Sequence, residues 1–349
     1  MKRRIAVLLC LLMLVSVMMT SCSSGKGETV MSYGDVSINE NIFIYMLALG
    51  KTQLLQNYSG ATTDIPMLWA QTIAEGTTFD DLSYLDQQLD MRVKLFFADY
   101  ALQHGGKLTS EEKKELQKQM DALVEQFGTK AALNKYLETY TMNYDLLEDY
   151  YEIEFLHSKG LSMAFSIDGE YEIPVEDAYT YYDNNFVTVK HIAIGTEYAG
   201  TDEDGNYIYY TEEEKTERKA LIDGIITALE NGEDWDKFAA LSEDKFNELN
   251  PDGYTITRGV LDRSMAGYES VAFSLEEGEW DTFELEGTST YIIKRVPLLE
   301  SDFENCYSTI MTTLIDAAST QTALDHDTGF VINEDIIDAY NMAMIPVLS

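Results

Sequence analysis

Few side chains in this sequence suit metal or covalent chemistry. The 349 residues include four histidines, at positions 104, 157, 191 and 326, and three cysteines. No H-E-x-x-H spacing and no C-x-x-C pair of a zinc site occurs. The G-x-S-x-G turn of a serine hydrolase and a glycine-rich phosphate loop are also missing. Metal-dependent and nucleophilic chemistries are therefore poorly supported, and we expect no metal ion and no cofactor.

One cysteine has a position with chemical meaning. A basic start at residues 2–4 is followed by an apolar run, residues 5–19, and then by Thr20-Ser21-Cys22. A membrane span needs about twenty apolar residues, so this shorter run matches a secretory signal better. A cysteine at the first mature position is typical of the bacterial lipoprotein box. We expect residues 1–21 to be removed, Cys22 to be lipidated, and residues 22–28 to form a flexible tether. The alternative is an ordinary signal peptide with a chance cysteine.

The net charge excludes one large class of partners. Without Lys2, Arg3 and Arg4, the chain keeps 21 basic against 61 acidic residues, a net charge of −40. Such a surface repels nucleic acid and anionic head groups, and it favours basic or neutral partners. The simpler interpretation is that the charge only keeps the protein soluble. The hydrophobic fraction of 45% and the aromatic fraction of 11% are too high for a disordered acidic chain.

The first half of the mature chain has the periodicity of helices. Two short strands around a Gly34-Asp35 turn precede a predicted helix over about 40–58, and a second long apolar period covers 83–104. Thr109 and Glu112 form a capping box for a helix that ends at Gly128. Two further helices are predicted around 130–140 and 143–157. This region should therefore be mostly helical.

The pattern changes after Pro174. The alternating, β-branched segment 187–194 predicts a strand, and further strands are expected at 254–259, 280–285 and 291–296. Thr211 and Glu214 make a second capping box, which starts a helix between the first two of these strands. Residues 303–317 return to helix. The predicted fold class is α+β, with a mostly helical module and a small domain built on a four-stranded antiparallel sheet flanked by helices.

Five segments in order carry a resemblance to a known family. They are VTVKHIAI, ALENGEDWDKFAALSED, GYTITRG, YESVAFSLEEGEW and TYIIKRV, all between residues 187 and 297. Together they resemble the parvulin-type peptidyl-prolyl isomerases. The mature start, the segment LQHGGKLTSEE and the long helices resemble the N-terminal chaperone module of SurA and PrsA. With the lipoprotein box, the arrangement is similar to the PrsA-type foldase lipoproteins of Gram-positive bacteria.

The resemblance implies a polar floor for an active site. His191 matches the histidine of the family's first strand, and Asp244 matches its Cys-or-Asp position. Thr288 stands where a Ser or Thr is usual, and Tyr291 replaces the second family histidine. Tyr291 can donate one hydrogen bond as that histidine would. Alternatively, the replacement indicates a domain that has kept the parvulin fold and lost its catalytic activity. Alternative roles are a hydrogen-bonded core histidine for His191 and a helix cap or an exposed acid for Asp244.

The same resemblance implies an apolar slot for a prolyl ring. Leu261 falls near the family's pocket methionine, Tyr268 matches its pocket phenylalanine, and Phe273 matches another wall position. On pattern alone, residues such as Tyr268 and Phe273 are more often core positions than site positions.

These observations predict a membrane-anchored extracytoplasmic foldase. It would isomerise X-Pro bonds and chaperone newly exported, unfolded polypeptides on the outer face of a Gram-positive-type cell membrane. It would act as a monomer or a homodimer and without nucleic-acid partners. The predicted domains are a helical chaperone module over 29–185, a parvulin-like domain over 186–299 and a helical segment over 300–349 that packs on the first module. The alternatives are a non-catalytic chaperone lipoprotein with a degenerate parvulin domain and a solute-binding lipoprotein, but the latter requires two similar α/β lobes.

Overall fold

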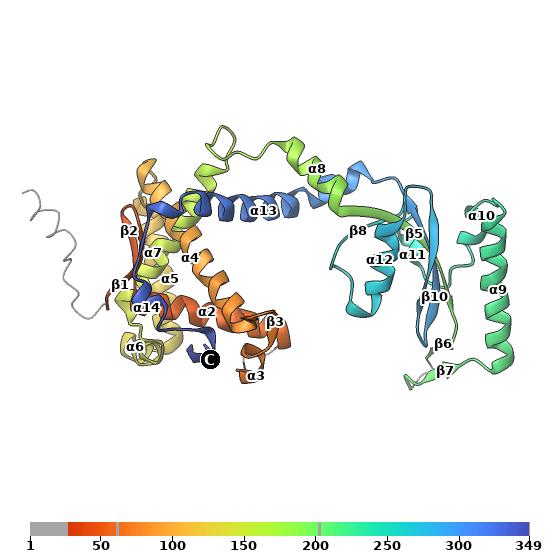
Figure 1. Ribbon diagram of the computed structural model, residues 1–349, viewed down its shortest axis with the longest axis horizontal. Coiled ribbons are helices and arrows are strands. Elements are labelled where there is room, and N and C mark those ends of the chain that lie inside the picture. Colours follow the sequence, from red (N-terminus) through yellow and green to blue (C-terminus); the bar gives the residue numbers. More distant parts are fainter. Residues whose placement is uncertain (1–26, 61–62, 202–203, 349) are drawn as a thin grey trace, which may run out of the picture. The chain divides into compact units, whose positions relative to one another are not determined.

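The chain folds into two compact units. The computed structural model describes residues 27–60, 63–201 and 204–348, so the predicted signal and Cys22 lie outside the described residues. One unit, called the sheet unit below, is Ile173–Leu314. The other, called the helical unit, combines the chain before the sheet unit with the chain after it (Figure 1). Helices and small antiparallel sheets agree with the predicted α+β class. None of the described helices has the length and apolarity needed to cross a membrane.

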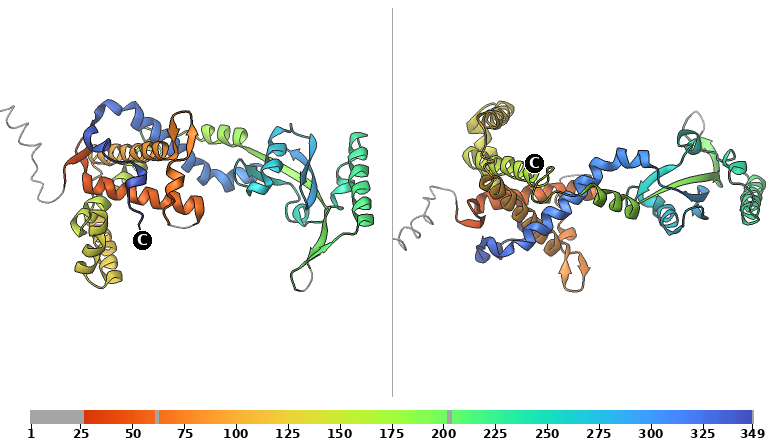
Figure 2. Two further views of the ribbon diagram at one scale, coloured as in Figure 1. Left: turned by 60° about the horizontal axis from the view of Figure 1, so that its bottom comes forward. Right: turned by 90° about the horizontal axis from the view of Figure 1, so that it is seen from above.

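The helical unit begins with a hairpin and continues through four long helices. Its elements before the sheet unit are β1 (Thr29–Tyr33), β2 (Val36–Asn39), α2 (Glu40–Ser59), α3 (Pro66–Trp69), β3 (Thr72–Ala74), β4 (Thr77–Thr78), α4 (Phe79–Gln103), α5 (Ser110–Phe127), α6 (Lys130–Leu137), η1 (Glu138–Tyr140) and α7 (Tyr144–Ala164). Figure 2 shows α5 and α6 as a helical pair that projects from the body of this unit in both views.

Helix starts follow their capping residues. The predicted capping boxes at Thr109 and Thr211 are confirmed, because each side chain accepts from the backbone N–H of a glutamate three residues later. Helix α4 begins at Phe79, four residues before the predicted start. Its cap is a third box, in which Thr78 and Asp81 satisfy each other's backbone N–H groups. The Asp81 carboxylate accepts the backbone N–H of the capping residue, as a glutamate or glutamine does in the usual box.

The C-terminal stretch completes the helical unit. After α13 (Glu300–Asp325), which begins in the sheet unit, come η3 (Asp327–Gly329), β11 (Phe330–Ile332), α14 (Glu334–Ile337) and η4 (Met342–Met344). Strand β11 pairs antiparallel with β1, giving a sheet of order β11-β1-β2. The ammonium group of Lys51 in α2 is fully buried and donates to the carbonyl oxygen of Ile345 at 2.8 Å and to the carboxylate of Asp64 at 3.0 Å.

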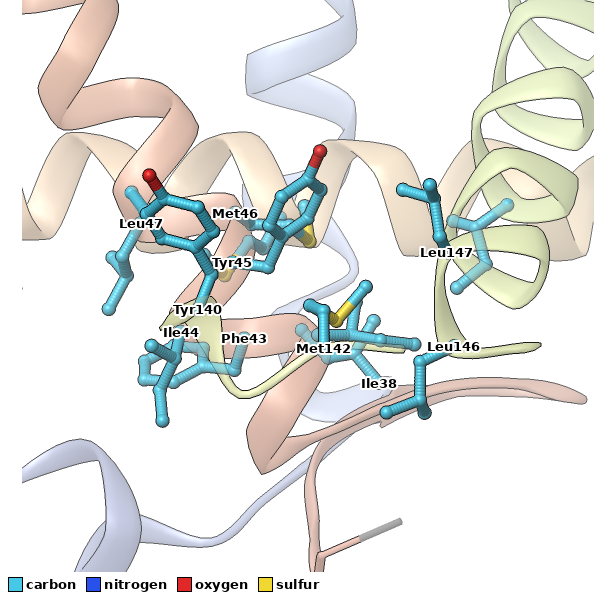
Figure 3. Packing of buried hydrophobic residues seen from close by; sticks show 14 of the residues in the cluster. Ile38, Phe43, Ile44, Tyr45, Met46, Leu47, Tyr140, Met142, Leu146 and Leu147 are labelled. Carbon is cyan, nitrogen blue, oxygen red and sulfur yellow. The ribbon is translucent and has the colours of Figure 1, made fainter. Parts of the chain in front are cut away.

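The main core of the helical unit lies between α2, α4, α7 and the C-terminal stretch. Its buried side chains include Phe43, Leu47, Met142 and Leu147, which Figure 3 labels among the packed residues of this cluster. Close packing of α4 on α7 depends on Gly160, because a Cβ atom there would lie 1.8 Å from the carbonyl oxygen of Phe97. The two helices therefore approach backbone to backbone at this point.

A partly buried histidine in α7 predicts acid lability of the helical unit. Burial lowers the pKa of His157 to about 4, with the charge of Lys94 acting in the same direction, and its Nε2 has no hydrogen-bond partner among the described residues. The unfolded chain binds this proton below a pH of about 6.5. The free energy of unfolding should therefore fall by about 3 kcal/mol between pH 6.5 and 4.

The measurement is denaturant unfolding of the helical unit at a series of pH values. His157→Leu should flatten this part of the pH profile because it removes the titrating group. His104→Gln changes an exposed histidine at the C-terminal cap of α4 and should leave the profile as in the wild type. Equal acid sensitivity in His157→Leu and wild type would assign the lability to other groups.

The sheet unit is a twisted antiparallel sheet with a helix on each face. Its elements are α8 (Val175–Asn185), β5 (Phe186–Gly195), β6 (Tyr198–Thr201), β7 (Tyr207–Tyr209), α9 (Glu212–Glu230), α10 (Asp236–Ala239), α11 (Phe246–Leu249), β8 (Tyr254–Thr257), η2 (Arg263–Met265), α12 (Ala266–Ser274), β9 (Trp280–Leu285), β10 (Ser289–Val296) and the first part of α13. The sheet order is β8-β5-β10-β9, with every neighbouring pair antiparallel.

The alternation along β5 sends side chains to two cores. Val187 and Val189 pack on the face that α12 covers. Ile192 and Ile194 pack on the opposite face against α9. Because side chains alternate along a strand, His191 lies on the α12 face. The predicted strand at 187–194 thus extends by one residue at each end and is buried on both sides.

Candidate functional site

The α12 face of the sheet holds the predicted polar residues. His191 lies opposite Ile293 of β10, and Tyr291 lies opposite Ala193 of β5. Directly paired residues of an antiparallel ladder share a face, so His191 and Tyr291 point to the same side. Their rings meet edge to face with centroids 5.2 Å apart. The His191 residue is only 4% exposed, so its ring belongs to the interior of the sheet unit.

Both ring nitrogens of His191 have partners. Nε2 lies 2.7 Å from a carboxylate oxygen of Asp244, and Nδ1 lies 2.8 Å from the hydroxyl of Tyr268. Burial, reinforced by the charge of Asp244 and by Tyr291, raises the pKa of Tyr268 far above its usual value, so this hydroxyl keeps its proton. Nε2–H donates to the carboxylate and Nδ1 is paired with the phenol hydroxyl, so both ring nitrogens are engaged inside the site.

Asp244 is held by its own loop as well as by the imidazole. Its second carboxylate oxygen accepts from the Ser242 hydroxyl at 2.9 Å and from the backbone N–H of Phe246 at 3.2 Å. Burial alone would raise the pKa of Asp244, but hydrogen bonds from His191 and Ser242 and the charge of His191 hold it below its usual value. Asp244 therefore stays a carboxylate, and its side chain remains 38% exposed at the edge of the site.

Aromatic rings surround the imidazole. Phe246 stacks on it at a centroid distance of 4.0 Å, and Tyr268 meets it edge to face at 5.6 Å. Phe283, which lies opposite Tyr291 across β9 and β10, stacks on Tyr291 at 6.1 Å. Gly267 allows α12 to lie this close to the sheet, because a Cβ atom there would be 2.3 Å from the Phe283 ring.

The three predicted wall residues have different positions. Leu261 and Phe273 are partly exposed and pack against the core of the α12 face. The guanidinium of Arg258 lies over the Phe273 ring at 4.0 Å. Tyr268 is only 3% exposed and its hydroxyl binds His191, so its side chain forms part of the floor of the site. The partly exposed apolar border of the site therefore consists of Leu261, Phe273 and Met265 of η2.

Thr288 lies apart from this hydrogen-bonded group. It sits in the turn between β9 and β10, where its N–H donates to Leu285 and its carbonyl oxygen accepts from the N–H of Thr196. Among the described residues no hydrogen bond joins it to His191 or Asp244. The structure thus groups His191, Asp244, Tyr268 and Tyr291.

Several residues of the site were not predicted. Ser242 and Phe246 flank Asp244, and Phe283 faces Tyr291. The spacing of Ser242 and Asp244 is that of a local side-chain turn, which could have indicated the first of these contacts. The predicted strands 280–285 and 291–296 could have paired Phe283 with Tyr291, had the length of the turn been used to fix their register.

The arrangement is suited to non-covalent chemistry. The described residues contain no cluster of three or more His, Cys, Asp or Glu side chains that could hold a metal ion. The Ser242 hydroxyl donates to Asp244, and Cys306, the free cysteine of the described residues, lies in α13, outside the hydrogen-bonded group of His191. What the site offers is a fixed, buried hydrogen-bond network beneath a partly exposed aromatic and aliphatic border.

Comparison with known proteins gives matches only among solved structures. No family model and no curated protein matches the sequence. The crystal structure of the peptidylprolyl isomerase PrsA from Bacillus cereus is 16% identical, with 78% of this chain and 91% of that chain covered and a TM-score of 0.29. PrsA from Bacillus subtilis is 14% identical (78% and 91% covered, TM-score 0.23), and the foldase protein PrsA from Lactococcus lactis is 13% identical (90% and 92% covered, TM-score 0.24). Identities and TM-scores this low do not carry the activity of those proteins to this chain.

Proposed function

We propose that this protein is a lipid-anchored extracytoplasmic foldase, whose sheet unit isomerises X-Pro bonds and whose helical unit binds unfolded exported chains. The observation that carries the proposal is the hydrogen-bonded group of His191, Asp244 and Tyr268 beside the aromatic ring of Tyr291. These residues come from four separate segments of the sheet unit, and three of them occupy positions at which the sequence resembles parvulin-type isomerases. Lipidation of Cys22 would place the chain at the membrane surface.

The chemistry of isomerisation matches what such a site can provide. Rotation about a peptide bond must cross a barrier of about 18–20 kcal/mol, because the planar amide is stabilised by charge separation. An apolar surface disfavours that charge-separated ground state more than the twisted state, in which conjugation is lost. Leu261, Met265 and Phe273 would receive the prolyl ring. The partly exposed Tyr291 would offer its hydroxyl to the amide, while the buried network keeps its ring in place.

A second candidate is a chaperone without turnover. The observation in its favour is that both nitrogens of His191 are already engaged and that Tyr268 is buried, so neither side chain faces a substrate directly. In this case the network would be a polar core that fixes the packing of α12 on the sheet. Both candidates share the membrane anchor and the binding of unfolded chains.

An isomerase assay separates the two candidates. With a proline-containing peptide and the full chain, we expect a rate above the uncatalysed one. Tyr291→Phe should lower this rate about threefold to tenfold because it removes the hydrogen-bond donor, and Tyr291→His should retain it because the imidazole supplies another. If the folded wild-type chain gave only the uncatalysed rate, the chaperone without turnover would be the remaining candidate. Equal rates for wild type and Tyr291→Phe would remove the hydroxyl from the mechanism.

A further inference from the structure

A large cleft in the helical unit is not used by the proposed isomerisation. It has a volume of about 1140 Å³ and is lined by both strands of the first hairpin, by β11 and by α7. We call it the β2 cleft, after the strand that runs along it. Small-molecule sites usually have volumes of about 300–1,000 Å³, so this space suits a longer ligand.

One side of the β2 cleft is an open sheet edge. In the sheet of order β11-β1-β2, strand β2 pairs with β1 and with no other strand of the described residues. Val36, Ser37 and Asn39 of this strand line the cleft. An edge strand presents unpaired backbone N–H and C=O groups, which are a template for another extended chain.

The other side is one face of α7. Asp149, Glu152, Ile153 and Leu156 line the cleft and follow each other at the i, i+3, i+4 and i+7 spacing of a single helix face. Ile153 and Leu156 are buried and form an apolar floor together with Val36. Glu152 is exposed. The cleft therefore has an apolar base between an acidic helix and a strand edge.

The charges around the cleft have one sign. Asp35, Asp149, Glu152, Glu334 and Asp335 are among the lining residues, and the described lining contains no lysine, arginine or histidine. Asp35 lies in the hairpin turn, and the last two residues begin α14. An occupant with positive side chains would be attracted to the cleft, whereas a negative one would be repelled.

We propose that the β2 cleft binds an extended, cationic and apolar segment of an unfolded polypeptide, which adds to the edge of β2 as a further strand. Alternate apolar side chains of the segment lie on the floor made by Val36, Ile153 and Leu156. Its lysine or arginine side chains face the acidic residues of α7 and α14. This inference rests on the proposed chaperone role and names the class of segment that the helical unit selects.

Fluorescence anisotropy with short labelled peptides tests the charge preference. The full chain should bind a peptide of alternating valine and lysine, and a peptide of alternating valine and glutamate should bind at least about tenfold more weakly. Raising the salt concentration should weaken only the first. Two further versions of the lysine peptide carry N-methyl groups on every second backbone amide, one version for each edge of the peptide strand. The version whose methyl groups block the edge that pairs with β2 should lose binding, because strand addition needs those N–H groups.

Two pairs of charge reversals provide a matched comparison. Glu152→Lys with Glu334→Lys places positive charge in the cleft and should weaken the lysine peptide about tenfold. Glu111→Lys with Glu125→Lys makes the same change in net charge on exposed positions of α5, outside the cleft, and should leave the affinity unchanged. Circular dichroism should give the wild-type spectrum for both pairs of substitutions, which checks that the fold is intact.

The outcomes separate this inference from the proposed function. Equal affinities for the two variant pairs, or for the lysine and glutamate peptides, would overturn the charge selection. Full binding by the methylated peptide in both registers would overturn strand addition. Suppression of aggregation of an unfolded protein is measured in parallel. If the wild-type chain does not suppress aggregation, the proposed chaperone role is refuted. If the cleft variants suppress aggregation as well as the wild type does, only the role of the β2 cleft is refuted.

Discussion

Replacing His191 with alanine should reduce the isomerase rate to background and lower the free energy of unfolding of the sheet unit by about 3 kcal/mol. The imidazole is 4% exposed and fills the space between the rings of Phe246 and Tyr291. Its removal leaves a cavity and a buried Tyr268 hydroxyl without its hydrogen-bond partner. Hydrogen exchange of the β5 amides reports the stability change, and the proline-peptide assay reports the rate.

The adjacent residue on the same strand supplies the control. Ile192 is fully buried but points to the α9 face, so Ile192→Ala should cost about as much stability while leaving the site intact. We expect this variant to keep most of its isomerase rate at temperatures where it is folded. If the two variants lost rate equally at equal folded fraction, the role of His191 would be structural only.

The substitution Gly160→Ala should destabilise the helical unit by about 3 kcal/mol. The new methyl group would lie 1.8 Å from the carbonyl oxygen and 2.6 Å from the carbonyl carbon of Phe97. Both atoms belong to the backbone of α4, so no side-chain rotation relieves the contact and the helices must move apart. The measurement is denaturant unfolding followed by a signal assigned to the helical unit, since two units need not unfold together.

A second helical glycine of the same unit shows the opposite case. At Gly50 an added Cβ would meet only the end of the Gln87 side chain, which can rotate away. Alanine is favoured over glycine inside a helix by about 1 kcal/mol, so Gly50→Ala should be neutral or slightly stabilising. Similar destabilisation by Gly50→Ala and Gly160→Ala would show that the loss comes from removing glycine and not from the α4–α7 contact.

Local patterns were sufficient to predict much of the fold. The alternation at 187–194 predicted a strand because successive side chains of a strand point to opposite faces of the sheet. The capping boxes at Thr109 and Thr211 were visible because they need only two residues at a fixed distance. Helix α4 begins before its predicted start, because Asp81 takes the place of the usual glutamate in the capping box.

Contacts between segments distant in the sequence could not be predicted from local patterns. The hydrogen bond between His191 and Tyr268 joins residues 77 positions apart. Family resemblance marked Tyr268 as a pocket wall because phenylalanine is usual there, but the added hydroxyl gives the ring a partner inside the site. Strand β11 has three residues, too few for a periodic pattern, and its partner β1 lies about 300 residues earlier.

The return of the chain to β1 imposes an order on biosynthesis. During synthesis from the N-terminus, the sheet unit is complete before the end of the helical unit is made and can fold first. The helical unit is completed later, because β1 lacks its neighbour β11 and the ammonium of Lys51 lacks the carbonyl oxygen of Ile345 until residues 330–345 are present. A chain cut short before β11 would thus carry an intact sheet unit together with an unfinished helical unit, and would be an early target for proteases.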